Sequence, residues 1–482
     1  MTITVVGLGP GDPGCITAAG AAALRTAPRL LLRTSIHPGV GTLLVGLDYE
    51  SCDDLYDAAP DFETLYARIV NRVIERATEP GGVCYAVPGS PLVGEATVRL
   101  LRRRAAEAEV PLTIVHGVSA LEPVLAAVGA DALDPALQVV DALDPRLDPQ
   151  LPAVVLQVYN RGVLAALKLA LLDRYPPEHP VVLVTSAGTR EERCEPARLD
   201  ELDRRADPDH LAALWLPALD PLLDRRTFGG FRSVVHRLYA PGGCPWDRQQ
   251  THDSLKRYVI EEAYELVEAI DYGDPAAVAE ELGDLMLQVG LHTEIADEAG
   301  EFGYGEVFQH ITDKLVRRHP HVFGDVGQRT TEEVVANWER LKAEEKPARE
   351  SLLDGLPASM PALAYSQSVQ GRAGSAGWDW PDVSGVLDQL TEELRELDRA
   401  QGADERHHEF GDVLFTLAHV AQHMGIDAED ALRRANRRFV RRFRQVERFC
   451  RERGLRLDTL DQATMDALWQ EAKARVVREH GG

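Results

Sequence analysis

The sequence predicts a multidomain protein in which an α/β domain precedes a longer all-α region, and three observations carry this prediction. The length of 482 residues corresponds to about three domains of roughly 150 residues. Short runs rich in β-branched residues alternate with Ala/Leu/Arg-rich stretches up to about residue 217. Beyond about residue 245 the strand signal nearly vanishes, and Glu/Ala/Leu/Arg segments with the period of a helix dominate.

Five runs are the predicted strands of the α/β domain: residues 2–6, 83–87, 112–115, 154–158 and 181–185. Because these runs alternate with helical segments, they predict a largely parallel sheet. Pro217 and Pro221 interrupt the pattern, and a second Pro/Gly-rich interruption follows at 240–245. We therefore expect the first domain at 1–217 and a linker at 218–232.

An internal repeat organises the helical region. The first copy contains Glu261, Glu262 and Glu265, followed by Glu281 and Asp284; the second contains Glu392, Glu393 and Glu396, followed by Glu409 and Asp412. A polar, Pro-containing stretch at 344–349 separates the copies and has the composition of a linker. We place the copies at 233–345 and 346–482.

The repeated acidic residues point to a metal site. Residues three or four apart share a helix face, so two antiparallel helices would bring four carboxylates together, and a cation is needed to neutralise them. Because only oxygen ligands are offered, Mg2+ is the expected ion, with Mn2+ as the alternative. A Glu-x-x-Glu pair is usually a solvated face, but both pairs recur and an apolar run follows each Gly-Asp. Glu261 and Glu392 are candidate bases or supports for the ligands.

Basic residues follow each acidic group at a similar distance. Lys314, Arg317 and Arg318 come about thirty residues after Asp284, and Arg438, Arg441 and Arg442 come a similar distance after Asp412. Guanidinium groups bind phosphate oxygens in a bidentate manner, so acid and base together indicate a metal-bound polyphosphate substrate. The arginine-rich segment 433–448 has two other interpretations, a surface stripe paired with acidic residues or a nucleic-acid patch.

Motifs in order along the helical half resemble those of MazG-type nucleoside triphosphate pyrophosphohydrolases. They lie at 243–247, 313–323, 337–339, 377–380 and 436–447, besides the acidic groups. The resemblance implies two tandem copies of an all-α fold, Mg2+ on the carboxylates, and hydrolysis of a nucleoside triphosphate to the monophosphate and pyrophosphate. The expected substrate-binding residues are Trp246, Lys314, Arg317, Arg318, Arg372, Trp380, Arg438, Arg442 and Trp469. The side chains of Trp378, Trp380 and Trp469 either stack on the nucleobase of the substrate or pack in the core of the helical region. Residues 367–371 lack the lysines that many relatives carry, and only Arg372 remains.

The first domain begins with a glycine loop, Gly7-Leu8-Gly9-Pro10-Gly11-Asp12. Asp12 would oppose the pyrophosphate of a dinucleotide at a helix start, whereas the cationic S-adenosylmethionine tolerates it. With segments 85–91, 116–120 and 184–189, residues 1–217 resemble the tetrapyrrole (corrin/porphyrin) methylases. The resemblance implies a two-lobed α/β fold that binds S-adenosylmethionine near Gly9, Pro10, Gly11, Pro88, Gly89, Ser119 and Ala120. A degenerate domain kept for folding, ligand sensing or oligomerisation is the other interpretation.

Charge and composition limit the partners and the compartment. The 52 Lys+Arg against 77 Asp+Glu give a formal net charge of -25, which disfavours nucleic acid. No apolar window reaches the length of a membrane span, and six widely spaced cysteines form no CxxC pair. We expect a cytoplasmic enzyme of nucleoside triphosphates that forms a homodimer through its helical half. A principal methyltransferase activity and a non-catalytic nucleotide-binding module are the competing functions.

Overall fold

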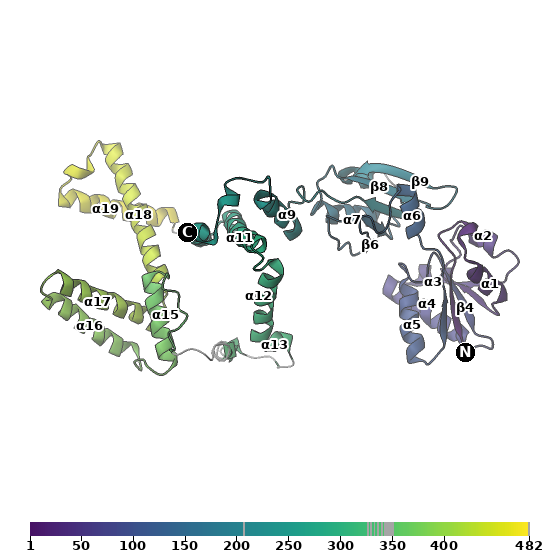
Figure 1. The fold of residues 1–482 in the computed structure, drawn as a ribbon, viewed down its shortest axis with the longest axis horizontal. Helices are drawn as coiled ribbons and strands as arrows, with labels where there is room; N and C mark the ends of the chain where they lie inside the picture. Colours follow the sequence, from purple (N-terminus) through teal and green to yellow (C-terminus); the bar gives the residue numbers. More distant parts are fainter. Residues whose placement is uncertain are drawn as a thin grey trace. The chain divides into compact units, whose positions relative to one another are not determined.

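The computed structural model describes residues 1–205, 208–324 and 351–480, together with residues 327, 330, 331, 333, 334, 337, 338 and 341. The chain divides into two compact units, Met1–Ile311 and Thr312–Gly482. The boundary falls inside the segment 233–345 that we assigned to the first helical copy. Figure 1 shows the α/β elements at the N-terminal end of the chain and helices in the remainder.

The first sheet is parallel throughout, as predicted. Its strand order is β3-β2-β4-β1-β5, with β1 (Ile3–Gly7), β2 (Leu30–Leu32), β3 (Glu50–Ser51), β4 (Val83–Val87) and β5 (Leu112–Val115). Its helices are α1 (Ala18–Thr26), α2 (Val40–Leu43), α3 (Asp53–Ala58), α4 (Phe62–Ala77) and α5 (Ala96–Glu107), with η1 (Pro13–Cys15). One buried cluster joins the sheet to α4 and α5, and another joins its opposite face to α1 and α2. Helices on both faces explain why β4 is apolar at every position.

A second sheet, which is mixed, corrects the expectation of one largely parallel sheet. Its order is β6-β7-β10-β8-β9, with β6 (Gln138–Asp141), β7 (Ala153–Leu156), β8 (Pro180–Thr185), β9 (Arg193–Arg198) and β10 (Ala212–Leu216). β10 runs antiparallel to both β7 and β8, and β9 antiparallel to β8. Its helices are α6 (Leu121–Val128), α7 (Arg161–Leu172) and α8 (Leu202–Arg205), with η2 (Leu199–Glu201). The sequence pattern missed β9 because this edge strand is polar and mostly exposed.

The remaining described elements are helical, which confirms the predicted all-α region. They are α9 (Phe228–Tyr239), η3 (Asp247–Gln249), α10 (His252–Tyr272), α11 (Pro275–Glu298), α12 (Tyr304–Arg318), α13 (Pro320–Phe323), α15 (Ala362–Ser375), α16 (Val383–Arg399), α17 (Ala403–His423), α18 (Ala428–Arg453), η4 (Leu457–Thr459) and α19 (Gln462–His480). Helix α9 begins at Phe228, inside the segment 218–232 that we expected to be a linker. Segment 344–349, the other expected linker, lies outside the described residues.

Two helical hairpins, α10–α11 and α16–α17, carry the acidic repeats. In the first, Gly273 ends α10 in the left-handed conformation and the Asp274 side chain caps the start of α11. In the second, Gly402 takes a positive φ of 96° immediately before α17. Such short turns force the two helices of each hairpin to run antiparallel and pack side by side, as Figure 1 shows for α16 and α17.

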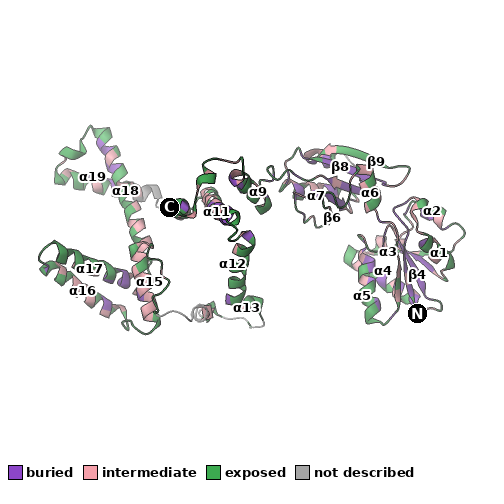
Figure 2. Cartoon of the chain, in the orientation of Figure 1, coloured by how far each residue is buried: buried purple, intermediate pink, exposed green. Residues whose placement is uncertain are grey.

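Each hairpin leaves an apolar stripe on its surface. The stripe of α11 consists of Leu282, Met286 and Val289, and the stripe of α17 consists of Phe410, Leu414 and Leu417, each residue between 41% and 54% exposed. The two sets occupy equivalent positions, because both follow the helical spacing i, i+4, i+7. In Figure 2, which colours residues by burial, the sheets are largely buried, whereas much of the surface of α16 and α17 is exposed. Within the described residues, no helix combines the length and apolar character needed to span a membrane.

Candidate functional site

The first acidic cluster lies on the hairpin of α10 and α11. Glu262 and Glu265 project from α10, and Glu281 projects from α11. Ligand oxygens of these three side chains all lie within 4.8 Å of one another. The charge of Asp284 acts on both Glu262 and Glu281. The hairpin therefore gathers the four residues that we predicted as ligands of the first copy.

The second acidic cluster lies on α16 and α17, with one carboxylate from the first helix and two from the second. Oxygens of Glu393, Glu409 and Asp412 lie within 4.8 Å of one another. The amide of Gln389, one turn earlier on α16, donates a hydrogen bond of 2.7 Å to Glu393 Oε1. The fourth predicted ligand, Glu396, feels the charges of Glu409 and Glu393.

In both clusters, carboxyl groups have pKa values above their usual range. Loss of solvent contact and then the charges of Asp284 and Glu265 raise the pKa of Glu262. The pKa of Glu281 is raised in the same way, by loss of solvent contact and then by Glu265 and Asp284. In the second hairpin, loss of solvent contact and then the charges of Glu409 and Glu393 raise the pKa of Glu396. The carboxylates repel one another, and a bound cation would relieve this repulsion.

The donor set fits a hard divalent cation. Every candidate ligand is a carboxylate, the class that Mg2+ and Mn2+ prefer. Glu281 Oε2 is buried and finds no hydrogen-bond partner among the described residues, so one oxygen of the first cluster is available to a cation. Oxygen ligands on one Mg2+ lie up to about 4.2 Å apart, so the observed spacing of at most 4.8 Å is close to that of a ligand set.

The candidate bases lie beside the clusters rather than within them. Glu261 and Glu392 are exposed, and each precedes a ligand pair on its helix. Glu261 acts electrostatically on Glu262, and Glu392 acts on Glu396. Their position at the margin of each cluster is compatible with a proton acceptor in contact with solvent.

A shallow pocket of about 450 Å³ adjoins the start of α10. Trp246 lines it and is 52% exposed, with its ring 6.1 Å from that of Tyr258. Lys256 and Arg257, which the sequence did not suggest as binding residues, also line it. Both lie on α10, five and four residues before Glu261.

In the first domain, the predicted cofactor loops meet at the carboxyl ends of the parallel strands. Gly9 and Gly89 exchange backbone hydrogen bonds of 2.8 and 3.2 Å. A Cβ added to Gly7 would come within 2.5 Å of the Gly89 oxygen, so the strands approach too closely here for a side chain. Pro10 and Gly11 follow Gly9 in the first loop, and Pro88 precedes Gly89 in the second. The carboxyl edge of a parallel sheet is where open α/β folds bind ligands.

The third loop, which contains Ser119 and Ala120, joins the other two. A Cβ on Gly89 would lie 3.9 Å from the Ala120 nitrogen. Ser119 is buried, accepts a hydrogen bond from the backbone of Leu121 and donates one to Glu122. All seven residues predicted for the cofactor therefore belong to loops at one edge of the sheet.

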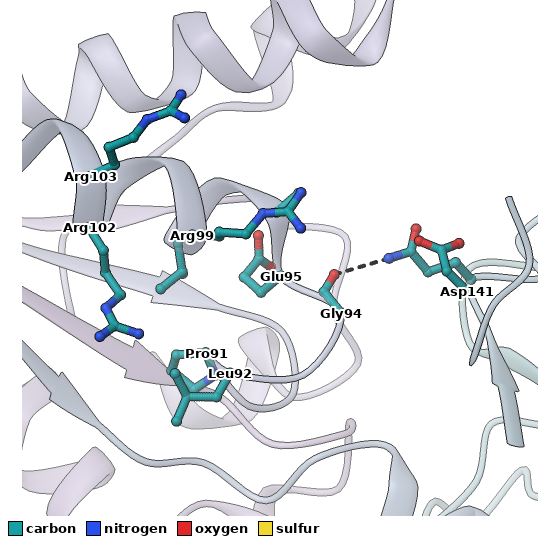
Figure 3. A pocket seen from close by; sticks show the side chains of 11 residues that line it. Pro91, Leu92, Gly94, Glu95, Arg99, Arg102, Arg103 and Asp141 are labelled. Atoms are coloured by element: carbon teal, nitrogen blue, oxygen red, sulfur yellow. Dashed lines mark hydrogen bonds between the residues drawn. The ribbon is translucent and has the colours of Figure 1, made fainter. Parts of the chain in front are cut away.

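A cavity of about 610 Å³ opens beside this edge (Figure 3). Arg99, Arg102 and Glu95 of the α5 segment line it, together with Asp141 and Gln157. The Gln157 amide donates a hydrogen bond of 3.1 Å to the Gly94 oxygen, and both residues line the cavity. The lining is mainly polar and carries both signs of charge.

Comparison with known proteins identifies both halves of the chain. The model of the Tetrapyrrole (Corrin/Porphyrin) Methylases matches residues 2–203, and the MazG nucleotide pyrophosphohydrolase domain matches residues 250–323. The nucleoside triphosphate pyrophosphohydrolase/pyrophosphatase MazG of Thermotoga maritima is 43% identical over 242 residues, which cover 50% of this chain and 93% of that protein. The chain belongs to the MazG family. Such relatives confirm the expected enzyme class, a hydrolase acting on phosphoric anhydrides.

The fusion of a methylase-like domain to a MazG half also occurs elsewhere. The "Uncharacterized protein YabN" of Bacillus subtilis is 39% identical over 485 residues, covering 98% of both chains. Among solved structures, uroporphyrin-III-C-methyltransferase of Thermus thermophilus is 24% identical and covers 47% of this chain and 98% of its own, with a TM-score of 0.37. The MazG domain match includes the first acidic hairpin and ends before the second.

The remaining predicted substrate residues of the MazG half lie in the second unit. Lys314, Arg317 and Arg318 are on α12, where the guanidinium of the buried Arg318 lies 5.7 Å from the ring centre of Trp338. Arg372 donates hydrogen bonds of 3.1 and 2.7 Å to the carbonyl oxygens of Leu352 and Asp354. These two bonds favour a structural role for Arg372, which fastens α15 to the preceding loop.

The C-terminal candidates of the MazG half lie on α18, on α19 and in the segment before α16. Arg438 and Arg442 lie on α18 and, among the described residues, form no ion pair with Glu393, Glu409 or Asp412. Trp469 packs against Phe439, with ring centres 5.2 Å apart, at the edge of the apolar core between α18 and α19. Trp380 is 41% exposed beside α17, whereas Trp378 is 84% exposed. Trp469 thus packs as part of the helical core, whereas the exposed part of the Trp380 ring is accessible to a nucleotide base.

Proposed function

We propose that this MazG-family chain is a divalent-cation-dependent nucleoside triphosphate pyrophosphohydrolase that releases the monophosphate and pyrophosphate. The observation that carries the proposal is the gathering of three carboxylates within 4.8 Å on each of two hairpins. The relatives named nucleoside triphosphate pyrophosphohydrolases support the substrate class. A role in clearing the nucleotide pool, in the cytoplasm, is the expected biological setting.

We assign the steps to residues of the chain as follows. Glu262, Glu265, Glu281 and Asp284, and their counterparts Glu393, Glu396, Glu409 and Asp412, hold the cation. When bound, Mg2+ or Mn2+ would polarise the triphosphate and lower the pKa of a water molecule. Glu261 or Glu392 accepts the proton of the water that attacks the α-phosphorus. Lysine and arginine side chains, including Lys256 and Arg257, compensate charge on the leaving pyrophosphate, and Trp246 or Trp380 contacts the base.

We also propose that the helical half contains two tandem MazG copies, at 233–345 and 346–482. Equivalent acidic clusters and equivalent exposed stripes on α11 and α17 support this interpretation. The stripes further support association of the chain into a homodimer through its helical half, because exposed apolar rows mark protein interfaces. Light scattering of the Met286→Glu and Leu414→Glu variants tests the dimer; a molar mass identical to that of the wild type would contradict it.

The activity test uses a panel of nucleoside triphosphates with Mg2+ and measures monophosphate and pyrophosphate. We expect Glu262→Gln and Glu393→Gln each to lower the activity and the double variant to be inactive with an unchanged circular dichroism spectrum. Glu268→Gln and Asp388→Asn are matched controls, since both residues are exposed on the same helices, α10 and α16. An active double variant would exclude the clusters from catalysis.

For the first domain, we propose S-adenosylmethionine binding at the edge formed by Gly9, Gly89 and Ala120. The methylase family match and the meeting of the three loops support this ligand. Calorimetric titration of Gly89→Leu against Gly46→Leu tests it, because both glycines have positive φ, 63° and 77°, and share the backbone strain. We expect only Gly89→Leu to lose binding. Equal affinities would place the ligand elsewhere, and no binding to the wild type would favour a degenerate domain.

A further inference from the structure

A third cluster of potential metal ligands lies in the second unit and contains imidazole. His419 Nε2 and His423 Nε2 are each 2.9 Å from Asp379 Oδ1. The three ligand atoms all lie within 4.8 Å of one another. His419 and His423 are four residues apart on α17, so their rings share one face of the helix. Asp379 comes from the segment that leads into α16.

The cluster is sheltered but keeps an opening to solvent. The side chains of His419 and His423 are 9% and 15% exposed, and that of Asp379 is 24% exposed. The ring of Trp380 meets that of His419 edge-on at 5.2 Å. On the other side, a Cβ added to Gly374 of α15 would lie 2.9 Å from Asp379 Oδ2. This close packing fixes the carboxylate in front of the two imidazoles.

We propose that Asp379, His419 and His423 bind a transition-metal ion, specifically Zn2+, at a site separate from the two acidic clusters. Two imidazoles and one carboxylate are a ligand set typical of Zn2+ sites that keep a water molecule in the fourth position. Mg2+ prefers oxygen ligands alone, so the chemistry of this cluster differs from that of the acidic clusters. The partial exposure of Asp379 leaves access for the ion and its water.

The position of the site indicates what the ion would do. His419 follows Asp412 by seven residues, which places it about 10.5 Å further along α17. An ion shared by Asp379 and the two histidines would fasten the segment Gly377–Trp380 to α17. The Trp380 indole, which touches His419, would be fixed together with this segment. We therefore assign the ion a structural role in holding this segment.

A purely hydrogen-bonded cluster is the competing interpretation, and a substitution separates the two. In that case both imidazoles donate an N–H to the same carboxylate oxygen. Asp379→Asn keeps an acceptor oxygen for these two donors but removes the charged ligand. Zn2+ needs the unprotonated Nε2 of each histidine and the negative oxygen. Asp379→Asn should consequently lower the affinity for Zn2+ while the fold is retained.

The experiment measures zinc bound by the full chain. The chain is stripped with a chelator, saturated with Mg2+ to occupy the acidic clusters, given Zn2+, and desalted before metal analysis. We expect the wild type to retain one Zn2+ more per chain than His419→Gln/His423→Gln. His407→Gln, an exposed histidine on the same helix, is the matched control and should retain as much as the wild type. Equal zinc in the wild type and the double variant would overturn the proposal.

Two further measurements keep the test decisive if the double variant is damaged. Circular dichroism reports whether it folds, and Asp379→Asn should bind Zn2+ at least about tenfold more weakly than the wild type. Zn2+ should also raise the unfolding temperature of the wild type and leave that of Asp379→Asn unchanged. If Asp379→Asn takes up and responds to Zn2+ as the wild type does, the cluster is only hydrogen-bonded.

Discussion

Removing one carboxylate from the first acidic cluster should leave the free energy of unfolding equal or higher without Mg2+. With Mg2+ present, the same substitution should lower it. The chosen change is Glu262→Gln in a Glu393→Gln background, so that the first cluster dominates the response to Mg2+. Glu262 carries a raised pKa because it has lost solvent contact and faces Asp284 and Glu265. Without a divalent cation, the substitution removes this repulsion, and the free energy of unfolding should stay equal or rise. When Mg2+ is present, the substitution removes one of its ligands, and the free energy of unfolding should fall.

The magnitude follows from the geometry and from linkage. Glu262 supplies one of the three ligand oxygens that lie within 4.8 Å of one another, so its loss leaves an incomplete ligand set. At a Mg2+ concentration 100 times the dissociation constant, binding stabilises the intact cluster by about 2.7 kcal/mol. If the substitution weakens Mg2+ binding about 100-fold, about 0.4 kcal/mol remains, a loss of about 2.3 kcal/mol. For a unit of 150–250 residues this loss would lower the midpoint by roughly 5–9 °C, and the decrease is smaller for the longer unit Met1–Ile311 that contains Glu262.

The assay is urea or thermal unfolding followed by far-UV circular dichroism, in chelator and in excess Mg2+. Glu268→Gln in the same background is the control, because Glu268 is exposed on α10 and lies outside the cluster. The control should gain as much stability from Mg2+ as the parent. The reasoning is refuted if Glu262→Gln gains as much as well, or if chelator destabilises both variants equally.

Three other changes probe the first domain and its junction with the helices. Burial lowers the pKa of His37 below its usual value of 6.5, so the stability that its neutral form provides is present above pH 6.5 and lost as the pH falls. His37→Gln should therefore flatten the dependence of the free energy of unfolding on pH below pH 6.5. An unchanged dependence in urea titrations at several pH values would contradict this. Tyr85→Phe removes a buried hydrogen bond of 2.9 Å to Thr97, so chemical denaturation should report a loss of about 1–2 kcal/mol; a neutral result would show that water or another donor replaces it. Gly230→Ala would place a Cβ 1.8 Å from the Asp224 oxygen, so α9 must shift and the thermal midpoint should drop by several degrees, whereas an unchanged midpoint would show that the turn adapts freely.

Several features of the fold followed from residue patterns alone. Strands β1, β4, β5, β7 and β8 were predicted from their apolar runs; β1, β4, β7 and β8 are largely buried, whereas β5 lies at a sheet edge and is only partly buried. The glycine loop at Gly9 was predicted from the run of glycines after the first strand, and the positive φ of 81° at Gly9 explains why glycine is needed there. The exposed edge strand β9 was missed because its polar residues carry no strand pattern. The antiparallel pairings of the second sheet were likewise missed, since strand direction depends on long-range pairing.

The candidate sites show the same division. Glu262 and Glu265 were predictable together because helical spacing places them on one face. The carbonyl oxygens that Arg372 binds could not be read from the sequence, because only the fold brings them to its guanidinium. His419 and His423 had a readable spacing, but Asp379 is forty residues away from the nearer of them along the chain. No sequence pattern near the two histidines indicated that Asp379 would contact them.

The amino-acid sequence by itself determined the helices, the strand runs, the order of the two halves and the faces on which the acids lie, because these depend on spacing along a few turns of chain. Only the tertiary structure decided which faces meet: α10 against α11, α16 against α17, and Asp379 against the histidines of α17. The physical reason is that charge repulsion and ligand geometry act through space over a few ångströms. Sequence distance carries almost no information about such contacts.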